Sequence, residues 1–364
     1  MLSKVFERIS NCWVLPILLV VVEAFTYFGA IQGDSAAYVN IVRFFRGTAS
    51  LQEAQVSQWH GILRPIVPIL AVPLSFLVSY RAAVALVNVA FLILGTFMMY
   101  IFGKRLFSPE VGFVSAVSFA SAIPILQYGA AVLTEGAGYA MLITLIYVIL
   151  FVLLERPDLK TAVFTGILVG IGILTKESNF IALIFLWACF ILNRKQLTLS
   201  SVITVTVIGI LLSFGWAQFV GHSNPLMYYG EGLRYQGRGY VGPLVHPTLF
   251  LLSAEYAFGV LLPFAFMGFF YVDNKAFRAM LEVLFSAGVV VLLWPTLPEN
   301  RLTFLTFPAV LPLAAFAITQ ASTILAERPF FGKFNRFFWL LLIILAMVGF
   351  NNLYGLKVNL RLRL

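Results

Sequence analysis

The sequence predicts an all-α integral membrane protein with about eleven transmembrane helices. Of the 364 residues, 61% are hydrophobic and only 11% are charged, whereas soluble domains carry roughly 25% charged residues. Apolar stretches of about 20 residues recur along the chain, and each is long enough to cross a hydrocarbon core of roughly 30 Å. We therefore expect one membrane domain over residues 1–364, without a separate soluble domain.

The transmembrane helices are expected where the apolar stretches lie. Their approximate bounds are 13–31, 82–103, 109–127, 137–154, 161–176, 179–193, 199–219, 248–271, 280–295, 302–325 and 337–354. Residues 62–80 are also apolar, but Pro65, Pro68 and Pro73 disfavour one continuous helix there. We expect this segment to lie in the outer interface, within a first outer loop of residues 32–80 that contains interfacial helices.

Positively charged residues fix the orientation of these helices. If the N-terminus is cytoplasmic, every inner segment contains at least two Lys or Arg residues, in agreement with the positive-inside rule. These residues are Lys4 and Arg8, Lys104 and Arg105, Arg156 and Lys160, Arg194 and Lys195, Lys275 and Arg278, and Arg328, Lys333 and Arg336. Membrane topology thus explains the net charge of +9, and nucleic-acid binding is not expected. We predict a multi-pass plasma-membrane protein with its polar site on the extracytoplasmic face.

Two acidic residues on the outer face are candidates for catalysis. Asp34 follows the first span, and a helix starting there would place Asp34 and Tyr38 on one face, at positions i and i+4. Aspartate is also a favoured N-cap, so the alternative is that Asp34 only starts this helix. Glu135 lies between two short spans, where a carboxylate does nothing for lipid packing. The alternative for Glu135 is an ordinary loop acid.

Three basic residues on the same face are candidates for binding an anion. Arg64 precedes Pro65 at the start of the interfacial segment, where a guanidinium can bind a lipid phosphate at headgroup depth. Lys176 lies in an outer turn next to Glu177, and Arg301 closes an outer turn just before a span. The alternatives are headgroup anchoring or snorkelling and, for Lys176, an ion pair with its neighbour Glu177.

Other polar residues give weaker signals. Glu23 lies inside the first span, where a carboxylate is costly enough to be a functional candidate, although it can also hydrogen-bond a neighbouring helix. The histidines His60 and His246 are far apart in the sequence, which is a weak metal signal. No P-loop, dinucleotide fingerprint, His-Glu-x-x-His helix or nucleophile elbow occurs. We therefore predict no definite cofactor and leave a divalent metal as an open alternative.

The order of these features resembles the GT-C superfamily of membrane glycosyltransferases, of the protein mannosyltransferase and aminoarabinose transferase type. The resemblance covers about residues 13–195 and 295–315 and rests on five local matches. These are Asp34 with Tyr38 after the first span, Arg64-Pro65 at the start of an interfacial helix, Thr134-Glu135 in the second outer loop, the glycine-rich span from Gly166 to Lys176, and the late turn from Arg301 to Pro308.

This resemblance implies a GT-C fold and a glycosyltransferase. Such an enzyme would move a hexosyl or pentosyl group from a polyprenyl-phosphate carrier to a lipid, glycan or protein acceptor on the extracytoplasmic side. By similarity, Asp34 would deprotonate the acceptor hydroxyl in an inverting displacement, and Glu135 would support the acceptor or the base. Arg64, Arg301 and Lys176 would bind the donor phosphate.

Further substrate contacts are expected from Tyr38, His60, Tyr235 and Tyr240. The last two lie in the outer loop of residues 220–247, whose aromatic residues suit sugar stacking and whose glycines suit the movement of a lid. The alternative is a rigid loop.

The chain departs from the family pattern at one position of the site. Ser35 stands where many relatives carry a second acid after the first Asp, which weakens the case for a metal held by two carboxylates. Two rival functions remain, a transporter or flippase of lipid-linked sugars and a polymerase or ligase of surface polysaccharide. A transporter is expected to show inverted repeats and a polar pathway at mid-membrane, whereas here the polar residues collect on one face.

Overall fold

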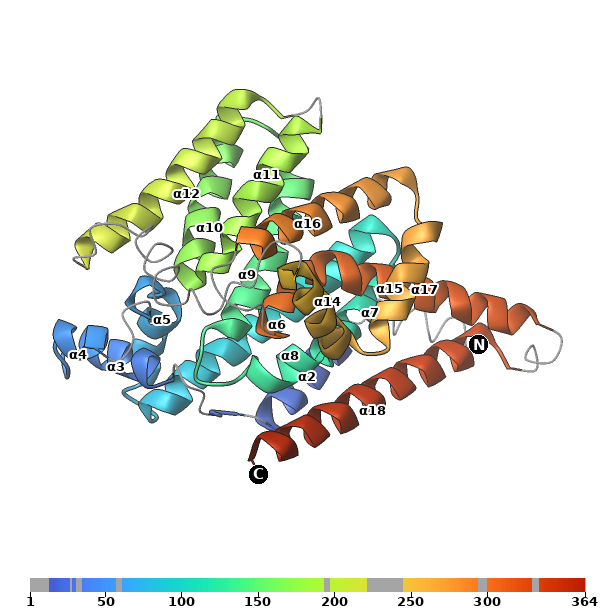
Figure 1. The fold of residues 1–364 in the computed structure, drawn as a ribbon, viewed down its shortest axis with the longest axis horizontal. Coiled ribbons are helices and arrows are strands. Elements are labelled where there is room, and N and C mark those ends of the chain that lie inside the picture. The colour runs from blue at the N-terminus through green and yellow to red at the C-terminus, as the bar shows by residue number, and fades with distance from the viewer. Residues whose placement is uncertain are drawn as a thin grey trace.

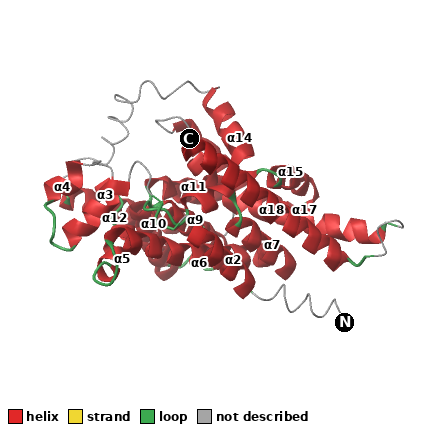
Figure 2. Cartoon of the chain, turned by 90° about the horizontal axis from the view of Figure 1, so that it is seen from below, coloured by secondary structure: helices red, strands yellow, loops and turns green. Residues whose placement is uncertain are grey.

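The computed structural model describes residues 13–26, 28–30, 35–56, 61–192, 197–220, 245–293, 300–328 and 334–363. Within these ranges the chain is helical and contains no strand, as the red ribbons of Figure 2 show. The predicted all-α fold class is confirmed.

The helices follow one another in a long series. The first are α2 (Val14–Thr26), α3 (Ser35–Phe45), α4 (Leu51–Val56), η1 (Gly61–Leu63), α5 (Ile66–Leu74), α6 (Tyr80–Leu106), α7 (Pro109–Ala120) and α8 (Ile123–Tyr128). Next come α9 (Glu135–Val148), η2 (Ile149–Leu153), α10 (Leu159–Thr175), η3 (Glu177–Phe180), α11 (Ile181–Ile191) and α12 (Leu199–Phe219). The last are α14 (Val245–Phe258), α15 (Leu261–Tyr271), α16 (Asn274–Leu293), η4 (Asn300–Thr306), α17 (Phe307–Glu327) and α18 (Arg336–Arg363). The η labels mark short 3-10 helices, except η2, which is a π-helix.

Many of these helices are apolar enough to lie in a membrane. Five segments are also long enough to cross it, namely Tyr80–Leu106, Glu135–Leu153, Leu199–Phe219, Leu302–Glu327 and Arg336–Tyr354. The shorter α2, α7, α10, α11 and α15 are apolar too. Large apolar side chains such as Leu211, Phe266 and Leu345 are exposed on the outside, as expected of a surface that faces lipid. The protein is therefore an integral membrane protein, although these segments do not establish the predicted number of about eleven spans.

Two of the predicted spans are interrupted. The span predicted at 248–271 is divided between α14 and α15, where Gly259 has a φ of +50°, a conformation that glycine adopts far more readily than other residues. The span predicted at 109–127 is divided between α7 and α8, and Pro124 stands in the first turn of α8. Proline lacks the N–H that a continuing helix would need, so it marks the start of a new helix.

The core of the molecule lies around α6, α7, α9 and α17. α6 packs against α7 and α9, while α17 packs against α7 and α15. α10 pairs closely with α12, and Figure 1 shows these two helices together with α11 in one group next to α9. α9 and α10 therefore connect the central helices with the end of the molecule where α3 and α5 lie.

The segment predicted to lie in the outer interface contains α5. This helix has nine residues and is about 14 Å long at 1.5 Å per residue, which is less than half of a hydrocarbon core of roughly 30 Å. It packs against α3 and α6, and Figure 1 places α3, α4 and α5 together at one side of the molecule.

Glu23 links the first and last described helices. Its Oε1 accepts a hydrogen bond of 2.8 Å from Nδ2 of Asn352, which lies in α18. This contact agrees with the alternative, considered from the sequence, that Glu23 hydrogen-bonds a neighbouring helix.

Candidate active site

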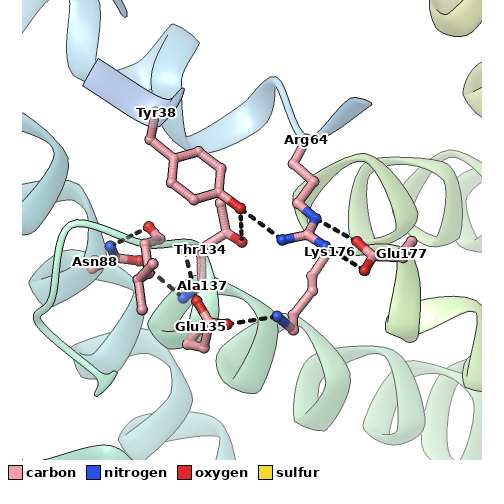
Figure 3. Close-up of polar contacts among 9 residues, drawn as sticks. Tyr38, Arg64, Asn88, Thr134, Glu135, Ala137, Lys176 and Glu177 are labelled. Carbon is pink, nitrogen blue, oxygen red and sulfur yellow. Dashed lines mark hydrogen bonds and ion pairs between the residues drawn. The ribbon is translucent and has the colours of Figure 1, made fainter. Parts of the chain in front are cut away.

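Four charged side chains lie together where α9 begins and α10 ends (Figure 3). Arg64 precedes α5, Glu135 is the first residue of α9, Lys176 directly follows α10, and Glu177 is the first residue of η3. We call these four residues the charge cluster. Its members come from three segments of the chain that only the fold brings together.

Arg64 uses its guanidinium to bind two other side chains. Its Nε donates to Oε2 of Glu177 and its Nη2 donates to Oε1, both at 2.5 Å. This bidentate arrangement is typical of arginine bound to a carboxylate or a phosphate. The remaining nitrogen, Nη1, donates to the hydroxyl of Tyr38 at 2.6 Å. The Arg64 side chain is only 7% exposed, so its charge depends on such partners.

Lys176 forms the second ion pair of the charge cluster. Its Nζ donates to Oε1 of Glu135 at 2.9 Å, and the two side chains are 5% and 1% exposed. The other carboxylate oxygen of Glu135 accepts a hydrogen bond of 3.1 Å from the backbone N–H of Thr134. A Cβ atom at Gly138 would lie 2.6 Å from Cδ of Lys176, so a larger residue at this position would require the lysine chain to shift.

Lys176 and Glu177 are neighbours in sequence but serve different partners. Lys176 reaches Glu135, and Glu177 reaches Arg64. The backbone of Lys176 is extended, with φ of −157° and ψ of 125°, and in extended chain successive side chains point to opposite sides. The two residues that follow α10 therefore supply a positive charge to the pair with Glu135 and a negative charge to the pair with Arg64.

The charges around Glu177 change its acidity. Burial acts to raise the pKa of Glu177, but the positive charges of Arg64 and Lys176 outweigh it and lower the pKa from 4.5 to about 2. Ionised Glu177 therefore stabilises the fold fully above pH 4.5, and this contribution is lost only as the pH falls toward about 2. At physiological pH, Glu177 remains a carboxylate.

Asn88 holds the loop that carries Glu135. This residue is buried in α6, and its Nδ2 donates to the carbonyl oxygens of Ala131 and Leu133 at 3.0 and 2.8 Å. Its Oδ1 accepts a hydrogen bond of 3.2 Å from the backbone N–H of Ala137. Asn88 is not among the site residues predicted from the sequence, although an amide inside an apolar span is a recognisable signal.

Tyr38 connects the start of α3 with the charge cluster. Its side chain is fully buried, and its hydroxyl lies 3.3 Å from Oγ1 of Thr134 as well as next to Arg64. α3 begins at Ser35, one turn before Tyr38. Asp34 is the residue before Ser35 in the sequence, but it lies outside the described residues.

Several other predicted site residues also lie outside the described part of the chain. These are His60, Tyr235 and Tyr240, together with residues 221–244 of the predicted lid. The backbone of Arg301 lies in η4, but its side chain is not described. Among the described residues, no group of three His, Cys, Asp or Glu side chains could hold a metal ion. The roles of these residues and the open alternative of a divalent metal stay predictions.

A family of known glycosyltransferases matches the part of the chain that contains the charge cluster. Residues 64–216 match the family described as dolichyl-phosphate-mannose-protein mannosyltransferase. The match begins at Arg64 and includes Glu135, Lys176 and Glu177. No curated protein sequence matches the chain.

The fold is similar to those of solved membrane glycosyltransferases. ArnT from Cupriavidus metallidurans, bound to undecaprenyl phosphate, aligns with a TM-score of 0.61 and 14% identity over 96% of this chain and 72% of that chain. The apo oligosaccharyltransferase of Archaeoglobus fulgidus aligns with a TM-score of 0.63 and 14% identity over 94% of this chain and 55% of that chain. AglB from the same organism, in complex with an inhibitory peptide and a dolichol-phosphate, aligns with a TM-score of 0.59 and 13% identity, over 97% of this chain and 56% of that chain.

These comparisons bear on the resemblance predicted from the sequence. At 13 to 14% identity the solved structures show the fold alone, and the chain spans little more than half the length of the archaeal enzymes. The family match covers residues 64–216, which contain the charge cluster. The predicted resemblance is confirmed: the chain is an integral membrane protein whose residues 64–216 match a mannosyltransferase family and whose fold is similar to those of solved membrane glycosyltransferases.

Proposed function

We propose that the protein transfers a hexosyl or pentosyl group from a polyprenyl-phosphate donor to a lipid, glycan or protein acceptor on the extracytoplasmic face. The observation that carries this proposal is the pair of nearly buried cations, Arg64 and Lys176, in one cluster beside the ends of apolar helices. Cations at such a position suit the phosphate of a membrane lipid. The positive-inside pattern of the sequence supports the outer placement of this cluster.

The ligands of the similar proteins support this class of donor. ArnT was solved with undecaprenyl phosphate, and AglB with a dolichol-phosphate. Both are long isoprenoid chains that end in a phosphate. By extension, we assign a polyprenyl phosphate as the carrier here, and the acceptor and the sugar remain open within the classes named above.

The proposed reaction is a direct displacement at the anomeric carbon. Asp34 takes the proton of the acceptor hydroxyl while the acceptor oxygen attacks from the side opposite the phosphate. The bond between the anomeric carbon and the phosphate oxygen breaks, its electron pair leaves with the polyprenyl phosphate, and the configuration inverts. Arg64 and Lys176, with Arg301, stabilise the charge that develops on the leaving phosphate.

The other predicted residues support this step. Glu135 supports the acceptor or the base in this proposal, and its carboxylate also contacts Lys176 and holds the ammonium in place. Tyr38 orients Arg64 through its hydroxyl. We assign contacts with the sugar or the acceptor to His60, Tyr235 and Tyr240, the last two from a lid formed by residues 220–247.

Replacing Arg64 by alanine is expected to weaken binding of the donor by about 10- to 100-fold. Hydrogen bonds to charged groups contribute about 1.5–3 kcal/mol, and each 1.4 kcal/mol changes an affinity tenfold. The measurement is the Kd for undecaprenyl phosphate with purified protein in detergent. The matched control is Arg105→Ala, because Arg105 also pairs with a glutamate, Glu155, but is 39% exposed and far along α6. An unchanged affinity of the Arg64 variant would leave Arg64 as a membrane anchor only.

A further inference from the structure

The charge cluster is already neutral without a substrate. Among the described residues it contains two cations and two carboxylates, arranged as two ion pairs. A phosphate that enters this nearly buried place adds negative charge, and an uncompensated charge in such surroundings is costly. A lipid phosphate that binds one of these two cations therefore competes with the carboxylate that the cation already holds.

Glu177 occupies the part of Arg64 that a phosphate would use. Its two oxygens accept from Nε and Nη2 of Arg64, and this fork binds carboxylates and phosphates with the same geometry. The third nitrogen of the guanidinium, Nη1, donates to Tyr38. A phosphate that binds Arg64 through its bidentate edge must therefore take the place of the Glu177 carboxylate.

Of the two carboxylates, Glu177 is the one that we expect a phosphate to displace from its cation. Its side chain is 19% exposed, against 1% for Glu135. Glu135 is also held from two directions, by Lys176 and by the backbone N–H of Thr134. Glu177 therefore lies closer to solvent than Glu135.

The 3-10 turn that begins with Glu177 contains buried polar atoms that have no hydrogen-bond partner among the described residues. η3 is a single 3-10 turn of four residues. Directly after Glu177, Oγ of Ser178 and Oδ1 of Asn179 are buried and have no hydrogen-bond partner among the described residues. Buried polar groups without partners are uncommon.

We propose that Glu177 is an internal anion that occupies the phosphate position on Arg64 in the ligand-free protein and is displaced by the phosphate of a polyprenyl-phosphate lipid. This inference rests on the proposed function. It adds a role for Glu177, which lowers the affinity of the site for the lipid phosphate. Glu177 keeps Arg64 oriented and its charge compensated between turnovers. After transfer, the returning carboxylate competes with the phosphate of the product and favours its release.

The exchange depends on competition and not on protonation of Glu177. The lowered pKa of about 2 keeps this carboxylate charged at physiological pH, so proton uptake does not free Arg64 in the ligand-free protein. The lipid phosphate itself must displace it, which makes the affinity for the lipid sensitive to the charge of residue 177.

Replacing Glu177 by glutamine tests this proposal, because glutamine keeps the shape of the side chain and removes its charge. We expect the Kd of purified protein for undecaprenyl phosphate to fall by about tenfold, since a charged competitor for Arg64 is lost. The matched control is Glu155→Gln, which removes the partner of Arg105 and is expected to leave the Kd unchanged. Arg105 lies roughly 25 Å along α6 from Asn88, the residue of α6 that holds the loop of Glu135. A purely structural Glu177 predicts the opposite sign, because Arg64 would lose its orientation and bind the lipid less tightly.

Two further measurements complete the test. In the double variant Arg64→Ala/Glu177→Gln, the gain from the glutamine should disappear, because the residue for which Glu177 competes is absent. In a structure of the wild-type protein with undecaprenyl phosphate, Arg64 should contact the phosphate and Glu177 should have left it, a readout that does not depend on any variant folding. An unchanged or weaker affinity of Glu177→Gln, or a bound lipid with the Arg64–Glu177 pair intact, overturns the inference alone. Absence of any binding by the wild-type protein contradicts the proposed function and the inference with it.

Discussion

Replacement of Asp34 by asparagine is expected to lower the turnover number by about 10²- to 10⁴-fold, the usual contribution of a general base. Asparagine has nearly the same size as aspartate but cannot accept the acceptor's proton at neutral pH. Because Asp34 is assigned to the acceptor and not to the donor phosphate, the affinity for undecaprenyl phosphate should change little. The measurements are the initial rate of sugar transfer and the Kd for the lipid, with the same purified protein.

A second variant separates catalysis from helix capping at Asp34. Asparagine and serine are both favoured N-cap residues, so Asp34→Asn and Asp34→Ser preserve a cap if Asp34 provides one. Both variants should therefore fold as stably as the wild type and lack activity. If either of them transfers sugar at the wild-type rate, Asp34 is only the start of a helix and the base lies elsewhere.

Replacement of Lys176 by methionine is expected to destabilise the protein by about 3–5 kcal/mol. The change leaves the carboxylate of Glu135, which is 1% exposed, without its ammonium, and breaking a buried ion pair on one side typically has this cost. The measurement is thermal unfolding in detergent. The donor affinity should fall as well, because the second cation of the proposed phosphate site is removed.

The double variant Lys176→Met/Glu135→Gln identifies the cause of this loss. Removing both charges leaves no unpaired ion, so most of the lost stability should return, whereas donor affinity should stay low. Arg105→Met is the exposed counterpart and should change stability by less than about 1 kcal/mol. A Lys176→Met variant as stable as the wild type would show that Glu135 does not depend on this pair.

Much of the fold could be predicted from the sequence, because the bilayer imposes long apolar helices and a bias of positive charge. The span predicted at 199–219 coincides with α12. The interrupted spans could not be predicted as easily. Gly259 is one of 27 glycines, and only its backbone angle in the folded chain marks it as the break between α14 and α15.

The candidate site could be predicted residue by residue but not as a network. The sequence singled out Tyr38, Arg64, Glu135 and Lys176, and the fold brings these four side chains together. Adjacency in the sequence suggests Lys176 as the partner of Glu177. Its pairing with Arg64, 113 positions away, depends on how α10 ends against α5, which no local pattern reveals.

As a glycosyltransferase of the proposed kind, this protein must break the bond between a sugar and a polyprenyl phosphate. The most direct test is to incubate purified protein in detergent with a polyprenyl-phosphate sugar and an extract of cell-envelope acceptors and to measure free polyprenyl phosphate. We expect release that is coupled to labelling of the acceptor and is lost in Asp34→Asn. A transporter or flippase makes and breaks no bond, so it would leave the donor intact in detergent. If every polyprenyl-phosphate hexose and pentose tested stays intact, the protein does not catalyse the proposed transfer.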